Sequence, residues 1–148
     1  MKVAVMTDSN SGLRQNEGKE LGIKIVPMPF MIDGEEYFED INLTQEMFYD
    51  KLTSDASVST SQPGIGVIMQ AWDDLLEEYD QIVYIPMSSG LSATCENATN
   101  YAKSFNGKVF VVDNKRISAT MKASVFEAIS LFSSSRICPH LYGVFWYT

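Results

Sequence analysis

Residues 81–94 read QIVYIPMSSGLSAT, and this stretch contains the junction that decides the fold. The apolar run from Gln81 to Pro86 is typical of a buried strand. A segment rich in hydroxyl groups follows, from Ser88 to Thr94, and an apolar-periodic helix begins after it. A strand, a polar loop and a helix in this order form the repeating unit of α/β proteins with a parallel sheet.

The rest of the chain repeats this alternation. We expect further strands at residues 3–6, 23–28 and 108–112, and helices that end near Leu21, begin after Thr44, span 65–79, and begin near Thr120. Between two short apolar runs, Asp33-Gly34 is a favoured two-residue hairpin turn. The predicted fold class is therefore α/β: a mostly parallel sheet flanked by helices on both faces, with a small β-hairpin insertion.

Two hydroxyl-rich loops, Ser59–Pro63 and Ser88–Thr94, each lead towards a predicted helix. Backbone N–H groups at a helix start are free to bind an anion, and short hydroxyl side chains add further donors. One hydroxyl per helix would satisfy capping, and both loops hold more than that. Neither loop contains Lys, Arg or His, so a carboxylate or phosphate would be held by neutral donors. This pattern favours ligand capture over catalysis.

The overall composition argues against several classes of protein. At 148 residues the chain fits one domain, and 45% hydrophobic residues are ordinary for a globular protein. A net charge of −8 argues against a nucleic-acid surface, which needs clustered Lys and Arg. Cys95 and Cys138 match no metal or redox spacing, and no apolar run is long enough to span a bilayer. We therefore expect a cytoplasmic protein without a cofactor, metal site, nucleic-acid partner or integral membrane contact.

Catalysis has little support in these motifs. A nucleophilic Ser needs a base within hydrogen-bond reach, and the one histidine of the chain, His140, lies in its last residues. Neither loop has the Gly-x-Ser-x-Gly spacing of a nucleophile elbow, and no Gly-rich phosphate-binding motif is present. A non-catalytic role is the main prediction. A hydrolase or transferase domain that acts on a phosphorylated or acyl substrate stays open as an alternative.

Four motifs occur in the order in which they are found in one known family. They are Thr7-Asp8-Ser9, Thr60-Ser61-Gln62-Pro63, Ser88-Ser89-Gly90-Leu91-Ser92-Ala93-Thr94, and Val112-Asp113-Asn114 with Ser118. On these residues the chain resembles the DegV family of fatty-acid-binding proteins. The resemblance implies two lobes with a long-chain fatty acid between them. It also implies a partner, a fatty acid kinase that phosphorylates the presented carboxylate for phospholipid synthesis.

The resemblance further implies which residues hold the ligand. Thr60 and Ser92 would bind the carboxylate, assisted by backbone N–H groups near Ser92 and Ala93. The full set of candidate ligand-binding residues is Thr60, Ser61, Ser92, Ala93, Ser89 and Ser9. Gly64, Ala93 and Asn114 depart from the Ser, Gly and Ser that are usual in the family. No catalytic residue and no metal ligand is implied.

The resemblance covers residues 1–128, which correspond to the N-terminal lobe of that family. Residues 129–148 match neither lobe and contain no acidic residue, so we expect an atypical tail that reflects a truncated or out-of-frame end. Without a second lobe we expect fatty acid binding to be impaired and the exposed apolar cleft to favour a homo-oligomer. A structural remnant that self-associates without binding lipid is therefore a second alternative.

Overall fold

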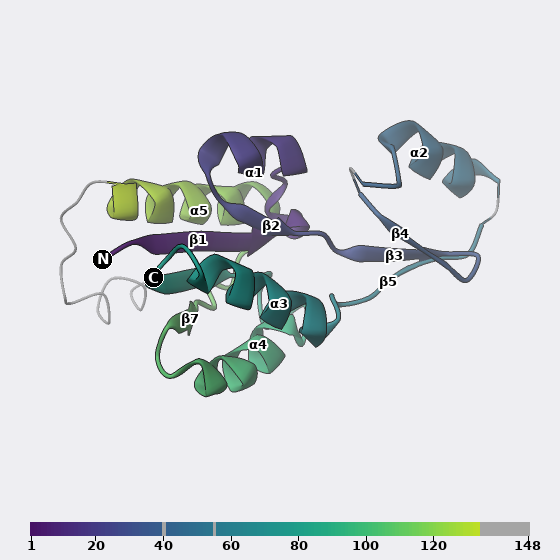
Figure 1. Cartoon of the computed structure of the whole chain (residues 1–148). Coiled ribbons are helices and arrows are strands. Elements are labelled where there is room, and N and C mark those ends of the chain that lie inside the picture. The colour runs from purple at the N-terminus through teal and green to yellow at the C-terminus, as the bar shows by residue number, and fades with distance from the viewer. Residues whose placement is uncertain (40, 55, 134–148) are drawn as a thin grey trace.

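The computed structural model describes residues 1–39, 41–54 and 56–133 (Figure 1). Most of the predicted tail, including Cys138 and His140, lies outside the described residues. Figure 1 shows a main body of helices around one sheet, and a smaller sheet with its own helix that extends to one side.

The main body is built on a four-stranded sheet. Its strands are β1 (Val3–Asp8), β2 (Lys24–Val26), β6 (Gln81–Ile85) and β7 (Val109–Val111), in the order β2-β1-β6-β7. All three pairings are parallel, so the carboxyl ends of the strands lie at one edge. Strands buried on both faces read as continuous apolar runs, which is why these short segments form a parallel sheet. The predicted parallel sheet is confirmed.

Helices cover both faces of this sheet, as predicted. They are α1 (Gln15–Leu21), α3 (Ile65–Leu76), α4 (Thr94–Ala102) and α5 (Ser118–Ser133), with two short 3-10 turns, η1 (Ser9–Ser11) and η2 (Lys103–Phe105). On one face, α3 and α4 pack against Met6 and Tyr84. On the other face, α1 and α5 pack against Val5 and Val83. Successive residues of a strand point to opposite faces, so β1 and β6 each contribute to both cores.

The smaller sheet contains the predicted hairpin and one further strand. Its strands are β3 (Pro29–Ile32), β4 (Glu35–Phe38) and β5 (Val58–Thr60), all antiparallel, in the order β4-β3-β5. The hairpin turns at Asp33 and Gly34, whose φ angles of 52° and 86° are both positive, as a type I′ turn requires. The hairpin is confirmed, whereas β5 was not predicted.

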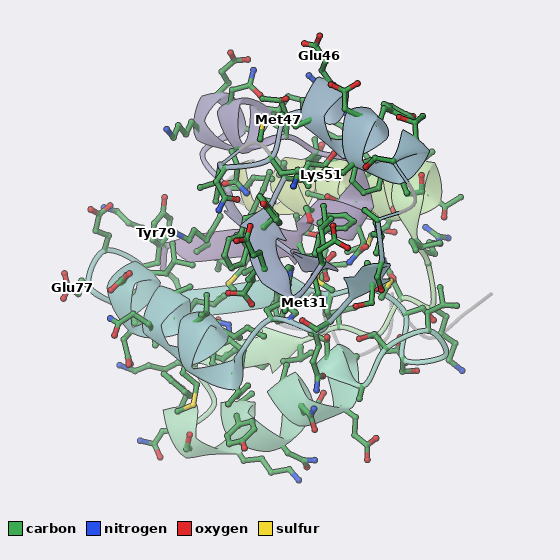
Figure 2. All side chains as sticks on the ribbon, turned by 90° about the vertical axis from the view of Figure 1, so that its right-hand side faces the viewer. Met31, Glu46, Met47, Lys51, Glu77 and Tyr79 are labelled. Carbon is green, nitrogen blue, oxygen red and sulfur yellow. The ribbon has the colours of Figure 1, made fainter. Side chains whose placement is uncertain are left out.

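Helix α2 (Gln45–Thr53) packs on this smaller sheet. Thr44 caps it as predicted, because its hydroxyl oxygen accepts a hydrogen bond from the backbone N–H of Met47 at 3.2 Å. Phe48 on the helix contacts Phe30 on β3, with ring centroids 5.5 Å apart. Figure 2 looks onto this end of the molecule, with Met47 and Lys51 on α2 and Met31 on β3.

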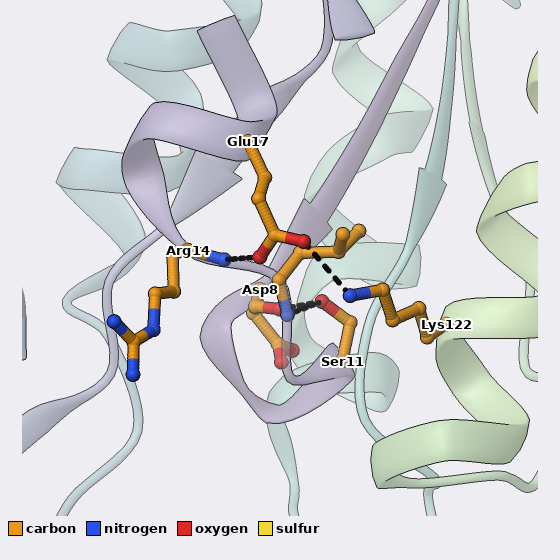
Figure 3. A network of polar contacts seen from close by, with 6 residues as sticks. Asp8, Ser11, Arg14, Glu17 and Lys122 are labelled. Atoms are coloured by element: carbon orange, nitrogen blue, oxygen red, sulfur yellow. Dashed lines mark hydrogen bonds and ion pairs between the residues drawn. The ribbon is translucent and has the colours of Figure 1, made fainter. Parts of the chain in front are cut away.

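Helix α5 continues beyond the predicted boundary at residue 128. Ile129 and Phe132 pack against the same core as α1, although the sequence groups them with the tail. The helix is also fastened to α1 by an ion pair of 2.9 Å between Lys122 and Glu17, whose other carboxylate oxygen accepts the backbone N–H of Arg14 (Figure 3). Among the described residues, no helix combines the length and hydropathy needed to cross a membrane.

The buried hydroxyl group of Tyr84 leads to a prediction about the free energy of unfolding. The side chain of Tyr84 is fully buried against Trp72, with ring centroids 6.1 Å apart, and its hydroxyl has no hydrogen-bond partner among the described residues. A buried polar group without a partner costs about 1–3 kcal/mol. Because Tyr84→Phe removes only the hydroxyl, we expect the free energy of unfolding in urea to stay equal or rise by about 1 kcal/mol.

A control variant separates the hydroxyl from the ring. Tyr84→Leu leaves a cavity, so it should lower the free energy of unfolding by about 2–4 kcal/mol. A loss of more than about 1 kcal/mol in Tyr84→Phe would contradict this account, because it would show that the hydroxyl has a stabilising partner.

Candidate functional site

Polar residues gather at the edge of the main sheet where its parallel strands end. Asp8 ends β1, Ser88 and Ser89 follow β6, and Asp113 follows β7. In open α/β sheets, ligands bind beyond this edge. The hydrogen bonds between these segments show how they are held together and which polar atoms are still available to a ligand.

Asp8 fastens the end of β1 to the segment that follows β6. Its buried side chain accepts the backbone N–H of Met87 on one oxygen, at 2.8 Å. The other oxygen accepts the backbone N–H and the side-chain amide of Asn10, at 2.9 and 3.0 Å. Burial raises the pKa of Asp8, and the hydrogen bonds from Met87 and Asn10 offset only part of that rise. Both carboxyl oxygens are thus engaged within the fold.

Ser9 connects the first strand to the second. Its hydroxyl oxygen accepts the backbone N–H of Met28, just beyond β2, at 3.1 Å, and the residue is half-buried. The candidate residue Ser9 therefore has a structural role at the edge of the sheet. The group that it could still offer to a ligand is its hydroxyl proton.

The second hydroxyl loop is tied to the segment after β7. The backbone N–H of Ser88 donates to the carbonyl of Arg116 at 3.1 Å. Ser89 donates twice to Asp113, from its hydroxyl at 2.5 Å and from its backbone N–H at 3.2 Å. Partial burial raises the pKa of Asp113, but hydrogen bonds from Ser89 and Lys115 outweigh it, so that the pKa lies below its usual value. The hydroxyl proton of Ser89 is therefore already in use.

Ser92 and Ala93 lie directly before helix α4, as predicted. The hydroxyl oxygen of Ser92 accepts the backbone N–H of Thr94 at 3.1 Å and lies 2.8 Å from the hydroxyl oxygen of Thr94. Ser92 is half-buried and Ala93 is exposed. The start of α4 thus combines a hydroxyl side chain with backbone N–H groups, which is the arrangement expected for an anion at a helix start.

The first hydroxyl loop differs from the prediction. Ser59 and Thr60 belong to strand β5 and do not lie at a helix start, because α3 begins only at Ile65 with Gly64 as its N-cap. Thr60 lies opposite Phe30 in the antiparallel pair of β5 and β3, and Ser59 lies opposite Met31. The side chains of Thr60 and Ser59 therefore point to opposite faces of the small sheet.

Thr60 and Ser61 are both exposed, and their hydroxyl groups make no hydrogen bond to another described residue. Ser61 is held by its backbone N–H, which donates to the carbonyl of Pro29 at 3.2 Å. Among the six candidate residues, these two therefore have the hydroxyl groups with the greatest freedom to meet a ligand.

A chain of hydrogen bonds connects the two hydroxyl loops. The side-chain amide of Asn97 on α4 donates to the side-chain oxygen of Gln62 at 3.2 Å. The backbone N–H of Asn97 in turn donates to the carbonyl of Ala93 at 2.9 Å. Gln62 comes two residues after Thr60, so the first loop lies beside the first turn of α4, close to the end of the second loop.

Sequence reasoning missed the polar residues that hold the loops in place. Asn97 lies in a helix that is predicted from its apolar residues, so its polar side chain gives no separate signal, and Arg116 lies outside both loops. The guanidinium of Arg116 donates to the hydroxyl of Ser124 on α5 at 2.8 Å, so this cation is engaged by a neutral partner. These roles depend on partners distant in the sequence, which no local pattern reveals.

A hollow of about 380 Å³ lies between α3 and the edge strand β2, away from the candidate residues. It is lined by Lys24, Val26, Pro27, Gly66, Val67, Gln70, Ala71 and Asp74. None of the six candidate residues contributes to it, so it is a feature separate from the hydroxyl loops. Within the described part of the chain, no group of His, Cys, Asp or Glu side chains could hold a metal ion.

The hydrogen bond from Ser89 to Asp113 leads to a prediction about the pKa of Asp113. Ser89→Ala removes the hydrogen bond from the hydroxyl to the carboxylate, so we expect the pKa of Asp113 to rise towards its ordinary value of 3.8. A carboxyl NMR titration measures this pKa directly. A lowered folded-state pKa stabilises the protein above the unfolded value and loses that effect as the pH falls. The stability difference between wild type and Ser89→Ala should therefore shrink in acid.

Ser104→Ala is the matched control. The hydroxyl of Ser104 donates to the carbonyl of Tyr101, so its removal should leave the pKa of Asp113 unchanged. An unchanged pKa of Asp113 in Ser89→Ala would show that the hydroxyl does not hold the carboxylate.

The chain was compared with known families and proteins. A family model described as "Uncharacterised protein, DegV family" matches residues 2–135. The DegV domain-containing 15.5 kDa protein of Staphylococcus aureus is 31% identical over 130 residues, which are 88% of this chain and 93% of that protein. The DegV domain-containing protein SA1258 of Staphylococcus aureus (strain N315) is also 31% identical over 130 residues, but these are only 47% of its length.

Solved structures of the same family match nearly the whole of this chain with about half of their own length. The chain matches a fatty-acid-binding DegV family protein from Thermus thermophilus with a TM-score of 0.84 and 29% identity, over 93% of this chain and 49% of that one. It matches DegV, a fatty acid binding protein from Bacillus subtilis, with a TM-score of 0.84 and 27% identity, over 94% of this chain and 50% of that one.

The chain therefore spans about half the length of these solved structures and of SA1258, and it corresponds to one lobe of them. The family model covers most of the chain, and the fold agrees with that of the solved relatives. This chain belongs to the DegV family.

Proposed function

We propose that this chain binds the carboxylate of a long-chain fatty acid through the hydroxyl groups of Thr60 and Ser92, without catalysing a reaction itself. The observation that carries the proposal is the connection from Gln62 through Asn97 to Ala93, which holds the first loop beside the start of α4. Relatives of known structure that are 29% and 27% identical are fatty-acid-binding proteins, which supports the same class of ligand here.

The candidate residues divide by what they can still donate. Thr60 and Ser61 have free hydroxyl groups, and Ser92 lies at the start of α4 with Ala93 beside it. Ser89 gives its proton to Asp113, so it contributes position more than binding. We therefore assign the carboxylate to Thr60 and Ser92, with the backbone N–H of Ala93 as a further donor and Ser61 nearby. The backbone N–H of Ser92 already donates to the carbonyl of Ser88 at 3.1 Å.

The free energies of burying the acyl chain and of binding the head group assign separate roles to the two ends of the ligand. Burying a dozen methylene groups contributes roughly 10 kcal/mol at about 0.8 kcal/mol each, before the cost of association. Each hydrogen bond to a charged head group adds about 1.5–3 kcal/mol. The acyl chain thus determines most of the affinity, whereas the hydroxyl groups determine where the carboxylate lies.

The carboxylate held in this way would be presented to a fatty acid kinase, which would convert it to an acyl phosphate for phospholipid synthesis. Neutral donors suit this hand-off, because they leave more electron density on the carboxylate oxygens than an arginine clamp does. The chain spans about half the length of its solved relatives, so less surface is available to cover the acyl chain. We therefore propose that the isolated chain binds fatty acid more weakly than a two-lobed protein.

Titration of the purified chain with palmitate, followed by native mass spectrometry and calorimetry, tests this function. We expect one palmitate per chain, and a decrease in affinity of at least about tenfold in Thr60→Val and in Ser92→Ala, because each loses a hydrogen bond to the charged head group. Ser59→Ala is the matched control, since Ser59 lies on the same strand but faces the other side of the sheet. It should keep the affinity of the wild type.

Two results would contradict the proposal. Equal affinity in all three variants would show that the hydroxyl groups do not hold the head group. A protein that dimerises without any bound palmitate would instead favour the self-associating structural role. Leu91 and Ile117 would be the first residues to examine in that case, with 63% and 40% of their surfaces exposed at the same edge of the sheet.

A further inference from the structure

The hydroxyl groups of the second loop differ in which of their hydrogen-bonding positions are occupied. A serine hydroxyl has one proton to donate and two lone pairs that accept. Ser88 accepts the backbone N–H of Gly90 at 3.2 Å, and Ser89 gives its proton to Asp113. Ser89 therefore has no proton left for a ligand, and Ser88 is buried, with 7% of its surface exposed. The remaining serine of the loop is Ser92, and its proton depends on Thr94.

Thr94 is buried, with 2% of its surface exposed, and the hydroxyl oxygen of Ser92 is the single hydrogen-bond partner of its own hydroxyl among the described residues. The two oxygens are 2.8 Å apart, so one hydroxyl donates to the other. If Ser92 donated, the proton of Thr94 would be buried without an acceptor, which is costly. If Thr94 donates, its proton is satisfied, and Ser92 keeps its own proton.

This arrangement leaves no buried proton without an acceptor, because Ser92 is only half-buried and its own proton can reach water. Its two lone pairs are then both occupied, one by the backbone N–H of Thr94 at 3.1 Å and one by the hydroxyl of Thr94. The single position left on Ser92 is its proton, which can meet water or a ligand on the exposed side.

We infer that Thr94 is a positioning residue that makes Ser92 an obligate hydrogen-bond donor, so that the site selects a head group that only accepts, such as an ionised carboxylate, over one that also donates, such as a fatty alcohol. This inference rests on the proposed function for its ligand. The direction of the hydrogen bond between Thr94 and Ser92 is a property of the fold and does not depend on a bound lipid.

The first experiment compares palmitate with hexadecanol, which has the same chain length and a head group that both donates and accepts. Thr94→Val keeps the shape of the side chain and removes its proton, so Ser92 regains a free lone pair and its hydroxyl is free to rotate. We expect palmitate affinity to fall about fivefold while hexadecanol affinity changes by less than twofold. The ratio of the two affinities is the decisive quantity, because a purely structural defect would weaken both ligands equally.

Thr94→Ser is the matched control, since it restores the hydroxyl and should restore the preference for palmitate. A thermal melt of both variants checks that they are folded. An unchanged ratio in folded Thr94→Val would overturn the inference, as would a preference that Thr94→Ser fails to restore.

The second experiment separates this inference from the proposed function. Neutron diffraction from the deuterated, ligand-free chain locates hydroxyl deuterium atoms directly. We expect the deuterium of Thr94 to lie between the two oxygens and that of Ser92 to point away. The reverse orientation overturns the inference even if palmitate binds. If palmitate does not bind at all, the proposed function fails, and the deuterium positions still decide the direction of this hydrogen bond.

Discussion

The carboxyl group of Asp8 is the contact on which the edge of the main sheet most depends. Parallel strands end at the same edge, where the backbone loses its sheet partners and polar groups must be satisfied in another way. Asp8 meets that requirement by accepting the backbone N–H of Met87, from a segment 79 residues later in the chain. Ser9 likewise accepts the backbone N–H of Met28, and Asp113 accepts the backbone N–H of Ser89. The loops that follow the strands are therefore fixed by the fold before any ligand arrives.

This fixed edge determines the chemistry that the loops can offer. The carboxylates of this edge have partners within the chain: buried Asp8 holds the backbone of Met87, and exposed Asp113 holds Ser89. Of the two cations that follow Asp113, Arg116 donates one guanidinium N–H to Ser124, and Lys115 is exposed. The candidate residues themselves offer only uncharged donors: the hydroxyl groups of Ser9, Thr60, Ser61 and Ser92, and backbone N–H groups at the start of α4. A site of this kind orients an anionic oxygen without neutralising it, which suits a carrier that hands its ligand to another protein.

The sequence predicts the main sheet, its helices and the hairpin because these elements have local signals: apolar runs, helical periodicity, and the Asp33-Gly34 turn. It did not predict β5, because Val58-Ser59-Thr60 contains one apolar residue and no alternation to mark a strand. Thr60 was consequently expected near a helix start, whereas it lies opposite Phe30 in a sheet.

The hydroxyl motifs predicted which residues deserve attention, but their roles depend on partners from elsewhere in the chain. The bond between Asn97 and Gln62 and the bond from Ser89 to Asp113 join positions 35 and 24 residues apart.

A crystal structure of the chain with bound palmitate tests the central claim most directly. The account predicts one carboxylate within hydrogen-bond distance, about 2.5–3.0 Å, of the hydroxyl oxygens of both Thr60 and Ser92. A carboxylate bound at any other place, or side chains of Thr60 and Ser92 too far apart to reach a single head group, would contradict it.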